Sequence, residues 1–142
     1  MKLKQISLFV ENRPGSMTAP ARVLADAGID ISTLMLADTK EYGILRLLVR
    51  EWERARKVLE AAGFTVRLTD VVAVEIEDRP GGLAKVLEAL ERNSVNVDYM
   101  YAFTEQRADK AIVIFRFEGP DDAIAALSKE GVGLVDGVTL FA

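Results

Sequence analysis

The sequence predicts an α+β protein made of two ferredoxin-like βαββαβ sandwiches in tandem, each an antiparallel sheet with both helices on one face. The first observation is a repeat. Glu-Asn-Arg-Pro-Gly-Ser-Met at residues 11–17 returns as Glu-Asp-Arg-Pro-Gly-Gly-Leu at residues 77–83, so the offset is 66. The second observation is that each copy shows the order strand, helix, strand, strand, helix, strand in its apolar pattern. A period of this length indicates duplication of one small unit.

The repeat extends well beyond this turn. Residues 27–31, Ala-Gly-Ile-Asp-Ile, align with residues 93–97, Asn-Ser-Val-Asn-Val, at the same offset. Residues 44–49 align with residues 112–117 at an offset of 68, which places two added residues in the loop 105–110. We therefore predict two domains, residues 1–70 and residues 71–142.

In the first copy, residues 2–10 alternate with Ile6, Leu8 and Val10 on one face, which is typical of a strand. Glycines follow the two predicted helices: Gly28 is expected to cap residues 16–27 in the left-handed conformation, and Gly63 is expected to end the helix of residues 52–62. The remaining predicted elements are a hairpin of residues 30–38 and 42–50 and a fourth strand from residue 65.

The second copy repeats this order. We predict a strand at residues 71–77, a helix at 82–93, a hairpin within 96–117, a helix at 120–129 and a closing strand near 138–141. One departure between the copies is Pro20, which falls in the first turns of the first copy's first helix. Because proline is tolerated only near a helix start, we expect this helix to begin late or to be distorted.

The strands also carry apolar residues on the face turned away from the helices. Ile44 and Leu48 oppose Leu45 and Leu47, and Ile112 and Ile114 do the same in the second copy. A sheet with one face in water alternates more cleanly than this. One interpretation is that a sheet from a second chain covers this face, which predicts a homodimer; the alternative is a few tolerated exposed aliphatic residues.

Composition excludes several functions. The chain has 142 residues, a net charge of −4, no cysteine and no histidine, so thiolate chemistry and the commonest general base and zinc ligand are absent. Its basic residues are interleaved with acidic ones, which argues against a nucleic-acid partner. No apolar run suits a membrane span. We expect a cytoplasmic protein that is not an enzyme, with no catalytic residue, no metal and no cofactor, and with neither a nucleic acid nor a membrane as partner.

The Arg-Pro-Gly turn has a chemistry of its own. It follows a strand and opens a helix. The first amides of a helix have no partner within the helix and lie at the positive end of its dipole. Such donors attract a carboxylate, and Asn12 or Asp78 beside them could bond an ammonium group. The alternative is that Pro-Gly is simply a tight turn in which these two side chains satisfy local backbone donors.

Two pairs of segments carry a family resemblance: the two Arg-Pro-Gly motifs, and the starts of the second strand of each copy at residues 29–31 and 95–97, called the strand entries below. On these segments the chain resembles a stand-alone tandem ACT domain protein over almost its full length. The resemblance implies an amino acid held between two ACT units, by the turn of one and the start of the second strand of the other. By position this nominates Asn12, Arg13, Pro14, Gly15, Ser16, Met17, Ile29, Asp30 and Ile31, and in the second copy Asp78, Arg79, Pro80, Gly81, Gly82, Leu83, Val95, Asn96 and Val97.

The resemblance further implies a non-catalytic regulatory module that binds a free amino acid and signals through changed domain or subunit packing. An alternative is an accessory regulatory subunit of an amino-acid metabolic enzyme, since the first half is similar to the small subunit of acetolactate synthase. An acylphosphatase-like enzyme on the same sandwich is a third class, but Arg13 and Arg79 precede prolines and do not match its phosphate-binding loop.

Two further groups of residues stay open. Tyr99, Tyr101 and Phe103 share one face of a strand, where they form either an aromatic pocket wall or part of the core. Asp121 and Asp122 begin a helix, where acidic residues are ordinary partners of the helix dipole, although a carboxylate pair also suits a metal.

Overall fold

The computed structural model describes residues 1–38 and 40–142, with the backbone alone at residue 38. The chain forms two compact units. The first copy is Lys4–Thr69, and the second copy is Asp70–Ala142 together with Met1–Leu3. Each unit is described by itself below.

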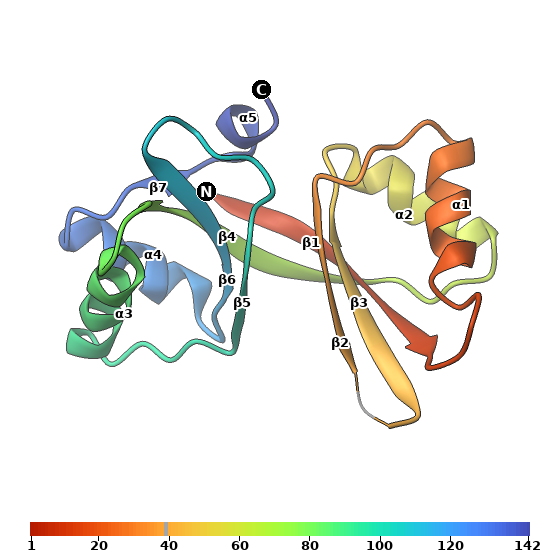
Figure 1. Ribbon diagram of the computed structural model, residues 1–142, viewed down its shortest axis with the longest axis horizontal. Helices are drawn as coiled ribbons and strands as arrows, with labels where there is room; N and C mark the ends of the chain where they lie inside the picture. The colour runs from red at the N-terminus through yellow and green to blue at the C-terminus, as the bar shows by residue number, and fades with distance from the viewer. Residues whose placement is uncertain (39) are drawn as a thin grey trace. The chain divides into compact units, whose positions relative to one another are not determined.

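In the first copy, the strands β1 (Lys2–Glu11), β2 (Thr33–Asp38) and β3 (Tyr42–Leu48) pair in the antiparallel order β2-β3-β1. The helices are α1 (Thr18–Asp26) and α2 (Trp52–Ala61) (Figure 1). The core joins Ile6, Leu8 and Val10 of β1 to Leu24 of α1 and Leu59 of α2. Because alternate β1 residues point the same way, both helices cover one face of the sheet, as predicted.

The second copy has the same plan. The strands β4 (Arg67–Glu77), β5 (Tyr99–Ala102) and β6 (Lys110–Arg116) pair in the order β5-β6-β4, and β7 (Leu134–Val135) also pairs with β4. The helices are α3 (Gly82–Arg92), α4 (Pro120–Lys129) and the short α5 (Gly137–Leu140). Phe115 and Phe117 stack in the core with ring centroids 5.5 Å apart.

The sequence predicted two strands around residue 70, and the structure has one. Strand β4 runs without a break through Arg67–Glu77. Neither glycine nor proline lies between residues 65 and 77, and Val71–Val74 are all fully buried. Without a breaker, the pairing of the fourth strand of one copy continues into the first strand of the next.

The predicted closing strand near residues 138–141 is wrong. The closing strand is β7, two residues long, and residues 137–140 form α5 instead. The Asp136 carboxylate accepts a hydrogen bond from the Thr139 amide at 2.8 Å, while the Asp136 backbone is extended. This is an N-cap, which satisfies an amide donor that has no partner within the helix and so favours a helical turn over strand pairing.

The late start expected for the first helix is confirmed. Helix α1 begins at Thr18, whereas α3 begins at Gly82, which aligns with Ser16. Pro20 is thus the third residue of α1, within the first turn where its missing N–H does little harm. Gly28 has a φ of +70°, as its predicted left-handed cap requires, and Gly63, which was predicted only to end its helix, also has a positive φ, of +93°.

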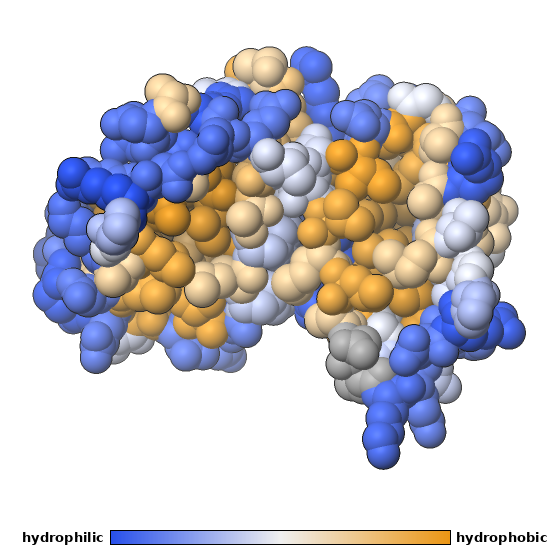
Figure 2. All heavy atoms as spheres, viewed as in Figure 1, coloured by the Kyte–Doolittle hydropathy of each residue, from blue (hydrophilic) through white to orange (hydrophobic). Residues whose placement is uncertain are grey.

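The two sheets differ on the face turned away from their helices. In the first copy, Phe9 is 59% exposed and Tyr42 is 55% exposed on this face. In the second copy, the corresponding face carries Ala73, Ile112 and Ile114, all buried. Figure 2 shows that apolar residues reach the surface in both units.

Candidate functional site

The two Arg-Pro-Gly turns have the same backbone hydrogen bonds. In the first, the amide of Asn12 donates to the Glu41 carbonyl at 3.0 Å; in the second, Asp78 donates to Asp109 at 3.0 Å. The amide of each arginine then donates to the carbonyl two residues earlier at 2.9 Å. The duplicated sequence therefore folds into a duplicated turn anchored to the following hairpin loop.

A glycine with positive φ turns the chain into each helix. The φ of Gly15 is +90° and that of Gly81 is +88°, a conformation that side-chain-bearing residues rarely adopt. Within the described part of the chain, the amides of Gly81, Leu83 and Ala84 meet no backbone acceptor. These unpaired donors lie at the start of α3, where the helix dipole favours an anion.

The side chains of both turns are held locally. The Asn12 amide group donates to the Lys40 carbonyl at 3.4 Å, and Gln106 donates to the Asp78 carboxylate. Gln106 belongs to the loop that contains the two added residues. Each arginine pairs with the glutamate two residues before it, Arg13 with Glu11 at 2.9 Å and Arg79 with Glu77. Each turn is thus held by an ion pair with the glutamate at the strand end and by a hydrogen bond to the following hairpin loop.

The nominated strand-entry residues lie at the other end of the helix that follows each turn. Ile29 is buried, and Ile31 packs against the first core, while Val95 and Val97 pack against the second. Only Asp30 and Asn96 are exposed. Nine helical residues extend about 13 Å. Within one unit, the structure therefore does not bring these segments to their own turn.

A cleft of about 450 Å³ opens beside the first turn. It brings together four of the nominated residues, Arg13 to Ser16, and leaves out Asn12 and Met17. Its other lining residues are Phe9, Val10, Glu11, Ala19 and Phe64. Sequence reasoning missed the two phenylalanines, because Phe64 lies far along the chain and Phe9 was assigned only to a strand.

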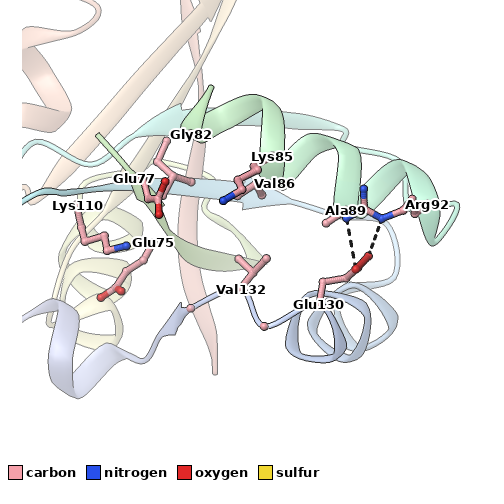
Figure 3. A pocket seen from close by; sticks show the side chains of 13 residues that line it. Glu75, Glu77, Gly82, Lys85, Val86, Ala89, Arg92, Lys110, Glu130 and Val132 are labelled. Carbon is pink, nitrogen blue, oxygen red and sulfur yellow. Dashed lines mark hydrogen bonds and ion pairs between the residues drawn. The ribbon is translucent and has the colours of Figure 1, made fainter. Parts of the chain in front are cut away.

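A smaller cleft of about 240 Å³ opens at the same place in the second copy (Figure 3). Gly82 alone of the nominated residues lines it. The rest come from α3, β4, β6 and the segment before β7: Glu75, Ile76, Glu77, Lys85, Val86, Ala89, Arg92, Lys110, Glu130, Gly131, Val132 and Gly133. Sequence reasoning missed these residues; the position of Lys85, one turn beyond Gly82, is a local signal that could have pointed to one of them.

The two clefts are lined by residues at equivalent positions of the sequence repeat. At an offset of 66, Phe9 aligns with Glu75 and Ala19 with Lys85; at 68, Phe64 aligns with Val132. At two of these positions the first cleft therefore presents an aromatic or small apolar group, Phe9 and Ala19, where the second presents a charge, Glu75 and Lys85. A conserved backbone frame thus holds two surfaces of different chemistry.

Gly82 has a structural role in the second turn. A Cβ at this position would lie 1.9 Å from the carbonyl oxygen of Glu77. Its amide also donates to the Arg79 carbonyl at 3.0 Å, whereas the amide of Ser16 reaches the Arg13 carbonyl at 3.3 Å. The turn before α3 is therefore tighter than the turn before α1, because glycine lets the helix start approach the strand end.

One ion pair closes the far end of the second cleft. Arg92 of α3 bonds Glu130 at 3.0 Å, and Asn93 also donates to this carboxylate at 3.2 Å. The hydrogen bond from Arg92 holds the pKa of Glu130 below its ordinary value, and the bond to Glu130 raises the pKa of Arg92. The pair ties the end of α3 to the end of α4.

The other candidate residues lie outside both clefts. Tyr101 and Phe103 are each 9% exposed, and Tyr101 pairs with Ile114 on the sheet face turned away from the helices. Asp121 pairs with Lys2 at 3.0 Å. Among the described residues, no group of three side chains is placed to hold a metal ion. None of the helices in the described part of the chain has the length and apolarity needed to cross a bilayer.

Comparison with known proteins agrees with this architecture. A protein of Bacteroides thetaiotaomicron has a crystal structure with a TM-score of 0.92 and 37% identity, covering 99% of this chain and 96% of its own. The ligand-free regulatory subunit of aspartate kinase from Thermus thermophilus has a TM-score of 0.65 at 20% identity, with 89% and 91% covered. Aspartate kinase from Synechocystis, at 23% identity, has a TM-score of 0.59 over 95% of this chain and 26% of its own.

No curated protein sequence matches the chain at a significant level. The two aspartate kinase structures show likeness of fold alone, because their identities are low. The family model for an ACT domain pair, in contrast, matches residues 1–140. With its two repeated turns and two βαββαβ units, this chain belongs to the ACT domain pair family.

Proposed function

We propose that this ACT domain pair is a non-catalytic regulatory module that binds a free amino acid at its Arg-Pro-Gly turns, between ACT units. The observation that carries the proposal is the set of unpaired amides at the start of α3, beside a glycine with positive φ. A carboxylate is a suitable partner for these donors. In this proposal the two binding domains are residues 1–70 and 71–142.

The second half of each site comes from another ACT unit. Asp30 and Asn96 are exposed at the strand entries, far from their own turns, and so are available to a ligand held by a neighbouring unit. A ligand that bridges two units favours one arrangement of them only by its higher affinity for that arrangement. Occupancy is thereby converted into a change of domain or subunit packing.

The proposal is tested by removing the amide donors. Ala84→Pro deletes one unpaired amide in the first turn of α3, where proline is tolerated, and Ala84→Ser is the matched control. Thr18→Pro with Thr18→Ala repeats the test at α1. Thermal unfolding is measured with each common amino acid; at a hundredfold excess over Kd, binding adds about 2.7 kcal/mol and raises Tm by about 5–10 °C.

A rise in Tm with particular amino acids that is lost in a proline variant and kept in its control supports the proposal. If no amino acid raises Tm, or if both proline variants respond like the unchanged protein, binding at the turns is contradicted. An accessory subunit of an amino-acid metabolic enzyme then becomes the better explanation. The regulatory subunit of aspartate kinase among the similar folds favours that second candidate, and co-purification with a larger enzyme subunit would support it.

We further propose that the chain forms a homodimer through the exposed sheet face of the first copy. Phe9 and Tyr42 protrude there beside the half-buried Ile44, and Arg67 lies 6.0 Å from the centre of the Phe9 ring. Covering this face removes aromatic surface from water. Sedimentation analysis is expected to show a dimer that dissociates in Phe9→Ser, whereas exchange of the exposed Lys57 for Ser leaves it intact. A monomeric unchanged protein contradicts this.

A further inference from the structure

The loop of residues 105–110, which lies between β5 and β6, contacts the second Arg-Pro-Gly turn. The side-chain amide of Gln106 donates a hydrogen bond to the Asp78 carboxylate, and the backbone amide of Asp78 donates to the Asp109 carbonyl at 3.0 Å. Both Asp78 and Gln106 are exposed, so a solute can reach this contact. The loop therefore occupies the carboxylate that the sequence offers as a partner for an ammonium group.

The same loop also holds the C-terminal helix. The Arg107 guanidinium donates to the Leu140 carbonyl at 2.7 Å, and Figure 1 shows α5 beside the loop that joins β5 to β6. Carbonyls in the last turn of a helix have no partner within the helix, so a cationic donor there stabilises its end. Gln106 and Arg107 are consecutive residues, and the contacts with the turn and with α5 therefore begin about 3.8 Å apart along the backbone.

The tip of the loop has an unfavourable backbone conformation. Ala108 has a φ of +54°, which a residue with a Cβ seldom adopts. The backbones of Arg107 and Lys110 bond each other on either side of it, at 3.1 and 2.9 Å. Such a conformation persists only while the surrounding contacts hold it. Loss of the contact with Asp78 therefore allows the loop to relax and to move Arg107.

Helix α5 is held by few contacts. The Asp136 cap holds its start and Arg107 holds its end, and of its four residues Leu140 alone is buried, whereas Val138 is 84% exposed. A helix of this length is not stable without such contacts. Small changes in one of them therefore shift α5 between a docked and a released state.

We propose that the loop of residues 105–110 couples the second Arg-Pro-Gly turn to α5, so that a ligand at the turn releases the helix. An ammonium group that takes the Asp78 carboxylate displaces Gln106, the loop relaxes, and Arg107 leaves the Leu140 carbonyl. This inference rests on the proposed function for the ligand, and it adds the element that responds to the second site. The first copy has no such element, because its fourth strand continues into β4.

Hydrogen exchange of the full chain, followed by NMR, tests the coupling without a ligand. The amides of Leu140 and Phe141 report on α5, because they donate to carbonyls within it and at its cap at 2.8 and 3.1 Å. Gln106→Ala removes only the contact with Asp78, and both amides should exchange about threefold faster or more. Glu105→Ala, at the exposed neighbouring position, is the matched control and should leave their exchange unchanged.

A double variant tests the route through Arg107. Arg107→Gln removes the bond to α5 directly, and Leu140 should exchange about tenfold faster or more, because the lost donor is charged. If Gln106 acts through Arg107, adding Gln106→Ala to this variant has no further effect. Two independent contacts would instead multiply their effects. Asp78→Ala should reproduce Gln106→Ala, and amides of β6 serve as the internal control.

The inference is overturned if Gln106→Ala leaves the exchange of Leu140 unchanged, or if the effects of the two loop variants multiply. It is also overturned if an amino acid raises Tm, loses this effect in Ala84→Pro, and yet leaves the exchange of α5 as it was; binding at the turn then stands without the coupling. If no common amino acid raises Tm while the variants behave as expected, the proposed ligand is contradicted and the link between loop and helix stands.

Discussion

The first and second copies place a cleft at the same point of the fold and line it with different chemistry. Phe9 and Phe64 make the first cleft aromatic, whereas Glu75 and Lys85 make the second one charged. The backbone hydrogen bonds of the two turns are nonetheless the same. The backbone has kept its geometry after duplication because turn and strand pairing depend on few residues, while exposed positions around them were free to diverge.

The largest expected effect concerns the tighter second turn. In Gly82→Ser, the new Cβ meets the Glu77 carbonyl, and the turn must open; we expect a loss of about 3 kcal/mol or more in the free energy of unfolding. In Ser16→Gly, the reverse change at the aligned position of the first copy, the loss should stay within about 1 kcal/mol. Urea unfolding followed by far-UV circular dichroism measures both variants.

The single tryptophan sharpens this comparison. Trp52 lies in α2 of the first copy, so its fluorescence follows that unit. In Gly82→Ser, the urea midpoint of unfolding measured by circular dichroism, which reports on both copies, should fall further than the midpoint measured by tryptophan fluorescence, which reports on the first copy. A loss in Gly82→Ser that stays within about 1 kcal/mol would contradict the close approach of the helix start to the Glu77 carbonyl.

A smaller effect is expected at α5, which has no counterpart in the first copy. The hydrogen bond from the Thr139 amide lowers the pKa of Asp136 below its ordinary value of 3.8. A lowered pKa in the folded state means that this contribution to stability is present above that value and is lost as pH falls through the lowered pKa. Asp136→Ala should remove the contribution at neutral pH.

Hydrogen exchange measures this prediction. The Thr139 amide should exchange faster in Asp136→Ala, and in the unchanged protein its exchange should accelerate only at acidic pH. Amides of β3 in the first copy serve as the internal control. If Thr139 keeps its protection in the variant, the cap does not hold α5.

The smallest effect is expected for the ion pair at the end of the second cleft. Arg92 and Glu130 align with Asp26 and Ala62, which cannot form such a pair in the first copy. Arg92→Gln should let the pKa of Glu130 rise toward its usual range, which an NMR titration records. The pair therefore favours folding above the usual glutamate pKa and loses this effect as pH falls through the lowered value. Because both groups are at the surface, Tm should barely change.

The elements that could be predicted are those with a local signal. The repeated turn, the glycines that end the helices and the late start at Pro20 each depend on a few adjacent residues. Strand β4 was predicted as two strands because the duplication suggested a boundary that no residue marks. The capping role of Asp136 was missed because the apolar residues beyond it resemble the end of a strand.

The clefts could not be predicted in the same way. The second cleft joins Lys85 of α3 to Lys110 of β6 and Val132 before β7, residues that are distant in the sequence. Their proximity follows from the packing of the helices on the sheet. Apolar periodicity indicates which face of a helix or strand is buried, but not which residues of another element lie against it. The nominated residues, such as Ile29 and Val97, were placed by resemblance rather than by any contact.

The sequence by itself determined the duplication, the fold class and the position of the two turns, because local propensity and apolar period act between neighbouring residues. Tertiary structure decided which distant side chains meet at each turn. It set charges around one cleft and aromatic rings around the other, since the pairing of strands and the seating of helices bring together residues that no local pattern connects.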